Sequence, residues 1–212
     1  MRATLPWLRR SAPRGDGGPV LVVPGFATDD NWTRNLRAFL CAVGWDARGW
    51  ELGRNHGKVP ELMPRLQARA ASLVEETDHA VRLVGWSLGG TLVREVARDR
   101  PDLVEHVVTL GAPVIGGPKY TASAPMYRRR GYDLDQIEAD VESRETVPIR
   151  VPIDAVYSRS DGIVAWRACI DRRTPGVRHH RVMSSHLGLV ASPGVFRLVA
   201  KLLAGSGADP SA

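Results

Sequence analysis

The sequence is poor in cysteine, with only Cys41 and Cys169 among its 212 residues. Neither belongs to a CxxC pair or has the spacing of metal ligands. We therefore expect no metal site, and by default two reduced thiols in a cytoplasmic protein. A single bridge between the two cysteines stays open as an alternative.

Long apolar runs are also missing. No stretch approaches the length of a membrane span, and residues 1–13 lack the apolar core of a signal peptide. We therefore expect no integral membrane contact. The chain contains no internal repeat and no linker that would divide it, so its length favours one domain with a full core.

The formal net charge of +6 raises the question of nucleic-acid binding. The basic residues fall in short, separate runs at Arg9–Arg10, Arg128–Arg130 and Arg172–Arg173, and none is interleaved with stacking aromatic residues. This distribution is typical of a solvated basic surface. We therefore expect no nucleic-acid partner.

What the chain does have is a regular alternation of two kinds of segment. Short apolar runs, and an alternating pattern at 45–52, predict strands, and stretches with apolar residues at helical spacing predict helices. The predicted strands cover 19–25, 45–52, 79–85, 104–113, 151–159 and 176–183; the predicted helices cover 32–43, 60–77, 88–99 and 193–204, with a further short helical stretch at 165–172 left open.

Strand alternating with helix indicates parallel strands joined by crossovers. We predict an α/β fold with a doubly wound, mostly parallel six-stranded sheet. One domain spans 19–204, with an irregular insert at about 114–147, a flexible N-terminal arm at 1–18 and a C-terminal tail at 205–212. In such a sheet the functional site lies in the loops after the carboxyl ends of the strands.

The stretch Gly85-Trp86-Ser87-Leu88-Gly89 matches the pattern G-x-S-x-G at a predicted strand-to-helix turn. A serine on so sharp a turn is exposed in a strained backbone, and neighbours without a Cβ let strand and helix pack closely. A serine that merely caps the helix would explain one residue, but not glycines on both sides and a third at Gly90. The pattern therefore predicts Ser87 as a nucleophile.

A serine nucleophile needs a base, and the base needs an orienting acid. Asp161 follows the predicted strand at 151–159, and His186 follows the last predicted strand. Both lie in loops at the expected edge and in the chain order Ser, Asp, His. We therefore predict Ser87, Asp161 and His186 as a catalytic triad, with Asp171 as a weaker alternative for the acid.

The other candidates lie in less suitable places. Asp154 falls inside its strand and is expected to be structural. The remaining histidines lie before the serine, at the opposite edge of the sheet or inside the last strand: His56, His79, His106, His179 and His180.

An oxyanion hole would pair the main-chain N–H after the nucleophile, that of Leu88, with an N–H from the loop after the first strand. Phe26, after Gly25, is the expected second donor. Asp30 or Asn31 is expected to cap the following helix.

The chain resembles the α/β-hydrolase superfamily, in particular short bacterial lipases and esterases. The resemblance is carried by "VLVVPGFATDD", "LVGWSLGGTLVREVA", "YSRSDGIVAW" and "SSHLGLV". It implies a minimal version of that fold and hydrolysis of carboxylic esters by Ser87, Asp161 and His186, without metal or cofactor. Two departures stand out: Pro24-Gly25 replaces the family's frequent His-Gly, and Trp86 replaces a frequent histidine.

The insert occupies the place where this family has its lid. It is heavily charged, is expected to contain one short helix, and lacks the broad apolar face that an interfacial lid needs. We predict a small cover and a soluble, short- to medium-chain acyl ester as the small-molecule substrate. Trp86 and Asn55 are candidate substrate-binding residues, although a turn held by the Asn55 side chain is equally open.

Two rival functions remain open at this stage. The same triad serves acyltransferases and thioesterases, and a catalytically silent binding protein could keep the fold. The oligomeric state is not indicated by the sequence.

Overall fold

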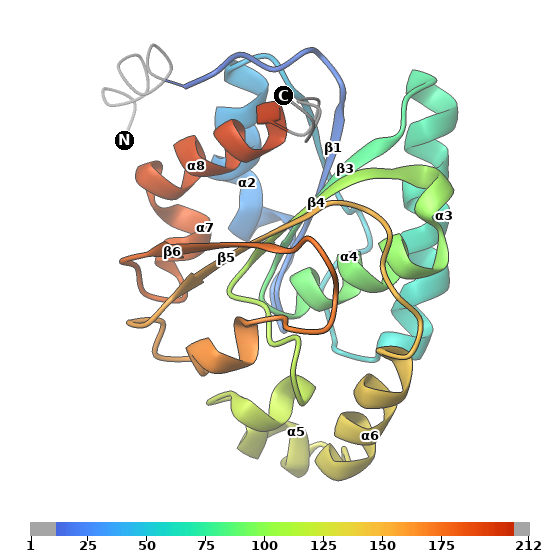
Figure 1. Ribbon diagram of the computed structural model, residues 1–212, viewed down its shortest axis with the longest axis vertical. Coiled ribbons are helices and arrows are strands. Elements are labelled where there is room, and N and C mark those ends of the chain that lie inside the picture. Colours follow the sequence, from blue (N-terminus) through green and yellow to red (C-terminus); the bar gives the residue numbers. More distant parts are fainter. Residues whose placement is uncertain (1–11, 206–212) are drawn as a thin grey trace.

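The computed structural model describes residues 12–205 and contains one six-stranded sheet in the order β2-β1-β3-β4-β5-β6 (Figure 1). Every pair of neighbouring strands is parallel, which confirms the predicted α/β architecture and makes the sheet wholly parallel. The strands are β1 (Pro19–Val23), β2 (Asp46–Gly49), β3 (Val81–Trp86), β4 (Val104–Leu110), β5 (Ile153–Ser158) and β6 (Arg178–Val182).

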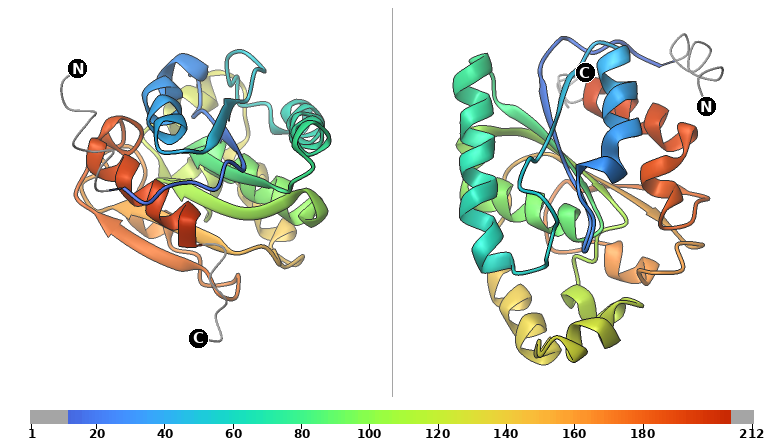
Figure 2. Two further views of the ribbon diagram at one scale, coloured as in Figure 1. Left: turned by 90° about the horizontal axis from the view of Figure 1, so that it is seen from above. Right: turned by 180° about the vertical axis from the view of Figure 1, so that it is seen from behind.

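Helices follow most of the strands and cover both faces of the sheet (Figure 2). The α-helices are α2 (Asp30–Ala42), α3 (Val59–Thr77), α4 (Leu88–Asp99), α5 (Ala124–Arg129), α6 (Leu134–Arg144), α7 (Gly188–Ala191) and α8 (Pro193–Ala204). Short 3₁₀ turns are η1 (Pro101–Leu103), η2 (Gly117–Tyr120) and η3 (Trp166–Cys169).

The strand period of two divides the core into two layers. In β1, Val20 and Val22 pack with α2 and α8 on one face, whereas Leu21 and Val23 pack with α3 and α4 on the other. All four side chains are buried. A strand covered on both faces needs a continuous apolar run, which explains the sequence Pro19–Val23.

The end of β2 and the cap of α2 differ from the sequence-based prediction. β2 ends at Gly49 instead of Leu52, because the main-chain N–H groups of Trp50 and Glu51 donate to the Asp30 carboxylate and not to a strand. This contact also occupies Asp30, so the expectation that Asp30 or Asn31 caps α2 is wrong. Asp29 is the cap, and its side chain accepts from the N–H of Asn31.

The insert contains two α-helices, α5 and α6, where one short helix was expected. Asp133 caps α6 by accepting from the N–H groups of the second and third residues beyond it. Tyr127 and Leu134 form a small apolar cluster that also contains Phe26 of the main domain. The insert therefore lies at the edge of the sheet where β1 ends, at the bottom of Figure 1.

Both cysteines are free: Cys41 is exposed on α2 and Cys169 is buried in η3, so they form no bridge. Burial raises the pKa of the Cys169 thiol to about 12, so the thiol is protonated and unreactive at neutral pH.

The predicted arm and tail lie largely outside the described residues. Of the arm, residues 12–18 follow the sheet edge, where Gly15 donates a main-chain bond to Val43 and Asp16 pairs with Arg82. Each helix within residues 12–205 is too short or too polar to traverse a bilayer.

Candidate active site

Ser87 sits at the sharp turn between β3 and α4. Its backbone angles are φ 55° and ψ −126°, a conformation that side-chain-bearing residues rarely adopt and that costs about 1–3 kcal/mol. The turn is held by the main-chain N–H of Ser87, which donates to the carbonyl of Leu110 at 2.9 Å. A strained, partly exposed serine at a strand end is the geometry that the G-x-S-x-G pattern predicts.

The three glycines around Ser87 are required by close packing. A Cβ on Gly85 would collide with the carbonyl of Gly89, and one on Gly89 would collide with the carbonyl of Val23. A Cβ on Gly90 would lie 2.5 Å from the Cβ of Ala112. The strand, the turn and α4 can therefore approach each other only with hydrogen at these positions.

His186 and Asp161 form a direct pair. The His186 Nδ1 lies 2.8 Å from the Asp161 Oδ2, and the His186 main-chain N–H donates to the Asp161 carbonyl at 2.8 Å. The other carboxylate oxygen accepts from the N–H groups of Ile163 and Val164 at 2.9 and 2.6 Å. An ionised carboxylate only accepts, so Nδ1 carries a proton and Nε2 is the ring nitrogen left to act as a base.

The same edge of the sheet carries Ser87 and His186. Trp86, the neighbour of Ser87, has its ring centroid 5.3 Å from that of His186 and donates its indole N–H to the His186 carbonyl at 3.1 Å. A Cβ on Gly111, next to the Leu110 that holds Ser87, would lie 3.1 Å from Asp161 Oδ2 and 3.3 Å from His186 Nδ1.

Two main-chain N–H groups beside Ser87 are available to a ligand. Within residues 12–205, neither the N–H of Phe26 nor that of Leu88 donates to a protein atom. Leu88 is the first residue of α4, where N–H groups have no partner inside the helix. Phe26, Leu88 and Ser87 all line the same cavity. Such donors can stabilise negative charge that develops on an oxygen.

Of the two roles left open for Asn55, the structure shows the turn and not the substrate contact: the Asn55 Oδ1 accepts from the Gly57 N–H at 3.2 Å. It is fully buried and donates its side-chain N–H to the Pro24 carbonyl at 2.9 Å. Its main chain exchanges hydrogen bonds with Ala27 and Thr28 at 2.7 and 2.8 Å. Because all these contacts hold the loop around Phe26, Asn55 fixes the loop and does not line the cavity.

Trp86, the other expected substrate contact, is also buried, with 3 % of its surface exposed. Its ring lies in the core layer of α2 and α8, behind Ser87, because a strand residue next to an outward serine points to the opposite face. The structure therefore places Trp86 against His186 and not in the cavity.

A cavity of about 770 Å³ extends from Ser87. The main domain contributes Phe26, Met63 and one face of α4, and the insert covers the cavity with side chains such as Tyr127 and Val141. Its size and its mixture of apolar walls with a few polar groups are typical of a small-molecule site.

Sequence reasoning missed three residues of α4 that line this cavity beyond Leu88, namely Thr91, Arg94 and Glu95. Their spacing from Ser87 places them on one helix face, so the signal was present in the helical period. Without the position of the insert, nothing distinguished that face from an ordinary core face.

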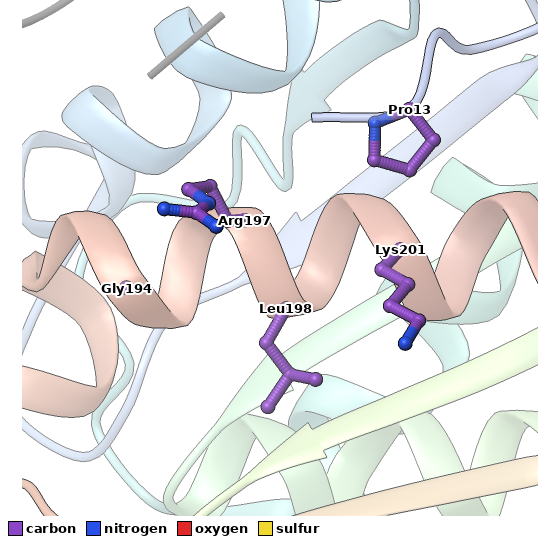
Figure 3. Close-up of a pocket in the computed structure, with 5 residues that line it drawn as sticks. All are labelled: Pro13, Gly194, Arg197, Leu198 and Lys201. Carbon is purple, nitrogen blue, oxygen red and sulfur yellow. The ribbon is translucent and has the colours of Figure 1, made fainter. Parts of the chain in front are cut away.

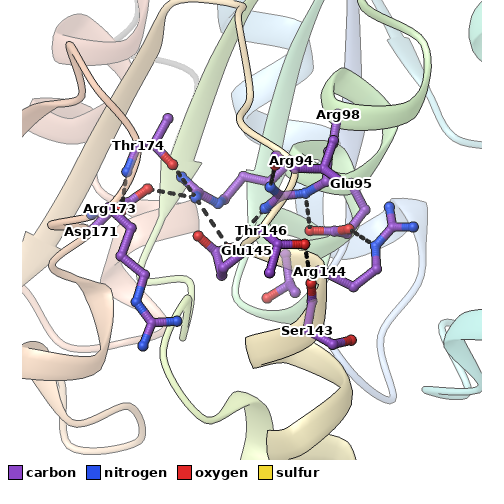
Figure 4. Close-up of polar contacts among 12 residues, drawn as sticks. Arg94, Glu95, Arg98, Ser143, Arg144, Glu145, Thr146, Asp171, Arg173 and Thr174 are labelled. Carbon is purple, nitrogen blue, oxygen red and sulfur yellow. Dashed lines mark hydrogen bonds and ion pairs between the residues drawn. The ribbon is translucent and has the colours of Figure 1, made fainter.

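Farther along α4 from Ser87, charged side chains line the cavity, and Figure 4 shows their polar contacts. Arg144 of α6 pairs with Glu95 and with Asp99 of α4, each at 2.6 Å. Beside them the buried Arg94 pairs with Asp171 at 2.6 Å. The two Arg144 pairs fasten the end of the insert to α4, and the Arg94 pair joins α4 to the loop after η3.

The rival acids have structural partners. Asp154 is fully buried at the centre of a cluster in which His106, Arg178 and His180 all contact its carboxylate at 2.6–2.8 Å. Although burial by itself raises the pKa of Asp154, these contacts lower it well below its usual range. Asp171 is held by Arg94, so neither acid is free to orient His186.

A second hollow, of about 370 Å³, lies along α8 (Figure 3). Pro13, Gly194, Arg197, Leu198 and Lys201 line it, and none of these is a predicted site residue. Among the described residues no group of three or more His, Cys, Asp or Glu side chains could hold a metal ion.

Comparison with known proteins places this geometry in context. No protein-family model matches the chain, and neither does any curated protein. Solved structures do match. A structure described under the metagenome-derived lipolytic enzymes LipS and LipT aligns with a TM-score of 0.72 and 14% identity over 91% of this chain and 96% of that chain. Bacillus licheniformis lipase BlEst2 aligns with a TM-score of 0.68 and 16% identity over 90% of this chain and 94% of that chain.

A third similar structure is the monoacylglycerol lipase of Paleococcus ferrophilus, with a TM-score of 0.66 and 17% identity over 92% of this chain and 97% of that one. At such low identity the likeness concerns the fold and not the activity. Together with the parallel sheet and the strained serine turn, these matches show that the chain has the α/β-hydrolase fold.

Proposed function

We propose that the protein is a serine hydrolase that cleaves carboxylic esters through an acyl-enzyme. The proposal is carried by the strained Ser87, which lines a cavity together with two residues whose main-chain N–H groups donate to no protein atom within residues 12–205. At the same edge of the sheet, a histidine is paired with a buried carboxylate. That the structural neighbours include lipases and esterases supports the same reaction class.

The mechanism follows from the roles of these groups. His186 Nε2 takes the proton of Ser87 Oγ as the oxygen attacks the ester carbonyl, and the N–H groups of Phe26 and Leu88 stabilise the oxyanion. The intermediate collapses when the imidazolium gives the proton to the leaving alcohol oxygen. Water, deprotonated by the same histidine, then attacks the acyl-enzyme and releases the acid. Asp161 stabilises the imidazolium in both steps.

The test is the exchange Ser87→Ala. We expect turnover of p-nitrophenyl esters to fall by about four to six orders of magnitude, since serine and histidine act as one unit. The circular dichroism spectrum should not change, because alanine fits wherever serine does. A variant that retains the full rate would refute the proposal. Product analysis in the presence of added alcohols and thiols distinguishes hydrolysis from acyl transfer.

The cavity favours a linear acyl group of limited length. Its lining runs from Ser87 along α4 to the ion pairs of Arg144 with Glu95 and Asp99. His186 packs against Trp86, so we place the leaving alcohol on that side of Ser87 and the acyl chain in the cavity along α4.

The usable length can be worked out from the helix. Arg94 lies seven residues after Ser87, which is about 10 Å along α4. An extended chain advances about 1.25 Å per carbon, so roughly eight carbons fit before the chain meets buried charges. We therefore expect acyl chains of about four to eight carbons to be preferred and palmitoyl esters to be poor substrates.

The exchange Thr91→Phe tests this assignment. Thr91 lines the cavity about 6 Å from Ser87 along the helix, so a ring there excludes roughly the last four methylenes of an octanoyl group. Their lost burial amounts to about 3 kcal/mol, or roughly a hundredfold in kcat/KM for the octanoate. The acetate, which does not reach position 91, should react within about twofold of the wild-type rate.

Gln136→Phe on the exposed side of α6 is the matched control, and it should leave both rates unchanged. An octanoate rate unaffected by Thr91→Phe would show that the acyl chain lies elsewhere.

A further inference from the structure

Trp86 contacts His186 in two ways that the triad itself does not require. The indole N–H donates to the main-chain carbonyl of His186 at 3.1 Å, and the two rings lie 5.3 Å apart with 35° between their planes. Trp86 is the last residue of β3 and directly precedes Ser87. The chain thus connects the nucleophile and the base through a single buried side chain.

The surroundings fix Trp86 firmly. Its ring is 3 % exposed within the core layer of α2 and α8, and Trp32 of α2 stacks on it at 6.1 Å. Because β3 lies in the middle of the sheet and its six residues are all buried, Trp86 is anchored to the most rigid part of the fold. His186, by contrast, lies in the loop after the edge strand β6.

We propose that Trp86 is a positioning residue that holds the His186 imidazole in line with Ser87. The inference rests on the proposed function. Asp161 fixes the ring at Nδ1 and leaves the ring free to tilt about that bond. Trp86 limits the tilt by holding the His186 carbonyl and by packing against the ring. The indole face also attracts the imidazolium that forms during proton transfer.

The test uses two exchanges at this position and one elsewhere. Trp86→Phe removes the N–H but keeps a ring, and Trp86→Leu removes both. Trp50→Phe is the matched control, because Trp50 is fully buried and its indole N–H also donates to a main-chain carbonyl, that of Gly53 at 2.9 Å. The substrate is p-nitrophenyl acetate, which is too short to report on the acyl cavity.

We expect kcat to fall about tenfold for Trp86→Phe and about a hundredfold for Trp86→Leu, with KM within about twofold, since misplacement of a base affects the chemical step. Trp50→Phe should keep kcat within about twofold. Thermal unfolding of all three variants shows which of them are folded at the assay temperature. Trp86→Phe, the more conservative exchange, supplies the comparison if Trp86→Leu is unfolded.

A double-mutant cycle separates positioning from a general structural effect. If Trp86 acts through His186, then Trp86→Phe should not change the residual rate of a His186→Ala variant. This inference would be overturned if Trp86→Phe lowered the rate equally in the wild-type and His186→Ala backgrounds. It would also be overturned if both Trp86 variants kept the wild-type kcat while Ser87→Ala was inactive. Either result would leave the proposed function intact. Full activity of Ser87→Ala would overturn both.

Discussion

Replacing Asp171 by asparagine tests the buried ion pair that joins α4 to the loop after η3. The Asp171 Oδ2 accepts from Arg94 Nη2 at 2.6 Å, and each side chain is 3 % exposed. Removing one partner of such a pair leaves a buried charge without its nearest counter-charge, which costs about 3–5 kcal/mol. Because Glu145 lies 3.9 Å from the same nitrogen, we expect the lower end, about 3 kcal/mol at pH 7.

The same pair predicts a pH dependence. Burial by itself raises the pKa of Asp171, but Arg94 and hydrogen bonds from Thr174 and Arg173 outweigh it and lower the pKa from its ordinary 3.8 to about 2. A carboxylate with a lowered folded-state pKa stabilises the fold above the unfolded pKa and loses that contribution as the pH falls through the folded pKa. The contribution is about 2 kcal/mol, and about half of it is lost by pH 3.

The assay is urea unfolding followed by circular dichroism at pH 7, 4 and 3. The free energy of unfolding of Asp171→Asn should lie about 3 kcal/mol below that of the wild type at pH 7, and the difference should shrink by about 1 kcal/mol at pH 3. Asp102→Asn is the control, because its carboxylate pairs with Arg100 at 2.7 Å where both side chains are largely exposed. It should not differ measurably from wild type. Equal losses for the two variants, or a difference independent of pH, would refute the reasoning.

Two further exchanges test the framework of the site. Gly90→Ala places a Cβ 2.5 Å from that of Ala112, so we expect about 1–3 kcal/mol lower stability together with reduced esterase activity; Gly194→Ala on α8, where the nearest atom is 3.7 Å away, should be tolerated. Thermal unfolding and kinetics of the pair decide this, and equal behaviour would contradict it. Asn55→Ala leaves the Pro24 carbonyl without its donor, so stability should fall by about 1–3 kcal/mol and kcat by about tenfold as the loop of Phe26 loosens. An unchanged kcat would show that Asn55 does not support the oxyanion donors.

Local patterns in the sequence were sufficient for the architecture. The central strands are mostly apolar runs and most of the helices have an apolar stripe, so the period and order of these segments predict a parallel sheet. The strained turn at Ser87 is encoded within five residues, which is why it is visible without a structure. Asp161 and His186 can then be assigned to the site, because each follows a predicted strand and their order along the chain is the one expected for the triad.

Long-range contacts explain what the sequence did not reveal. Asp30 ends β2 through bonds to residues about twenty positions away, and no local signal distinguishes it from Asp29 as a helix cap. A substrate contact was open for Asn55 because its loop faces the site, but its partner Pro24 lies 31 positions earlier in the chain. Trp86 meets His186 across 100 positions, which only the assembled sheet brings together.

The place of β6 at the edge of the sheet has a consequence for how activity is lost. β6 pairs with β5 along one side, and none of its five residues is buried. Its local opening therefore requires less free energy than opening of the central strands. Because the loop after β6 carries His186, such opening removes the base while the rest of the sheet persists. During denaturation, hydrolysis should thus cease before ellipticity declines, and during refolding it should return last.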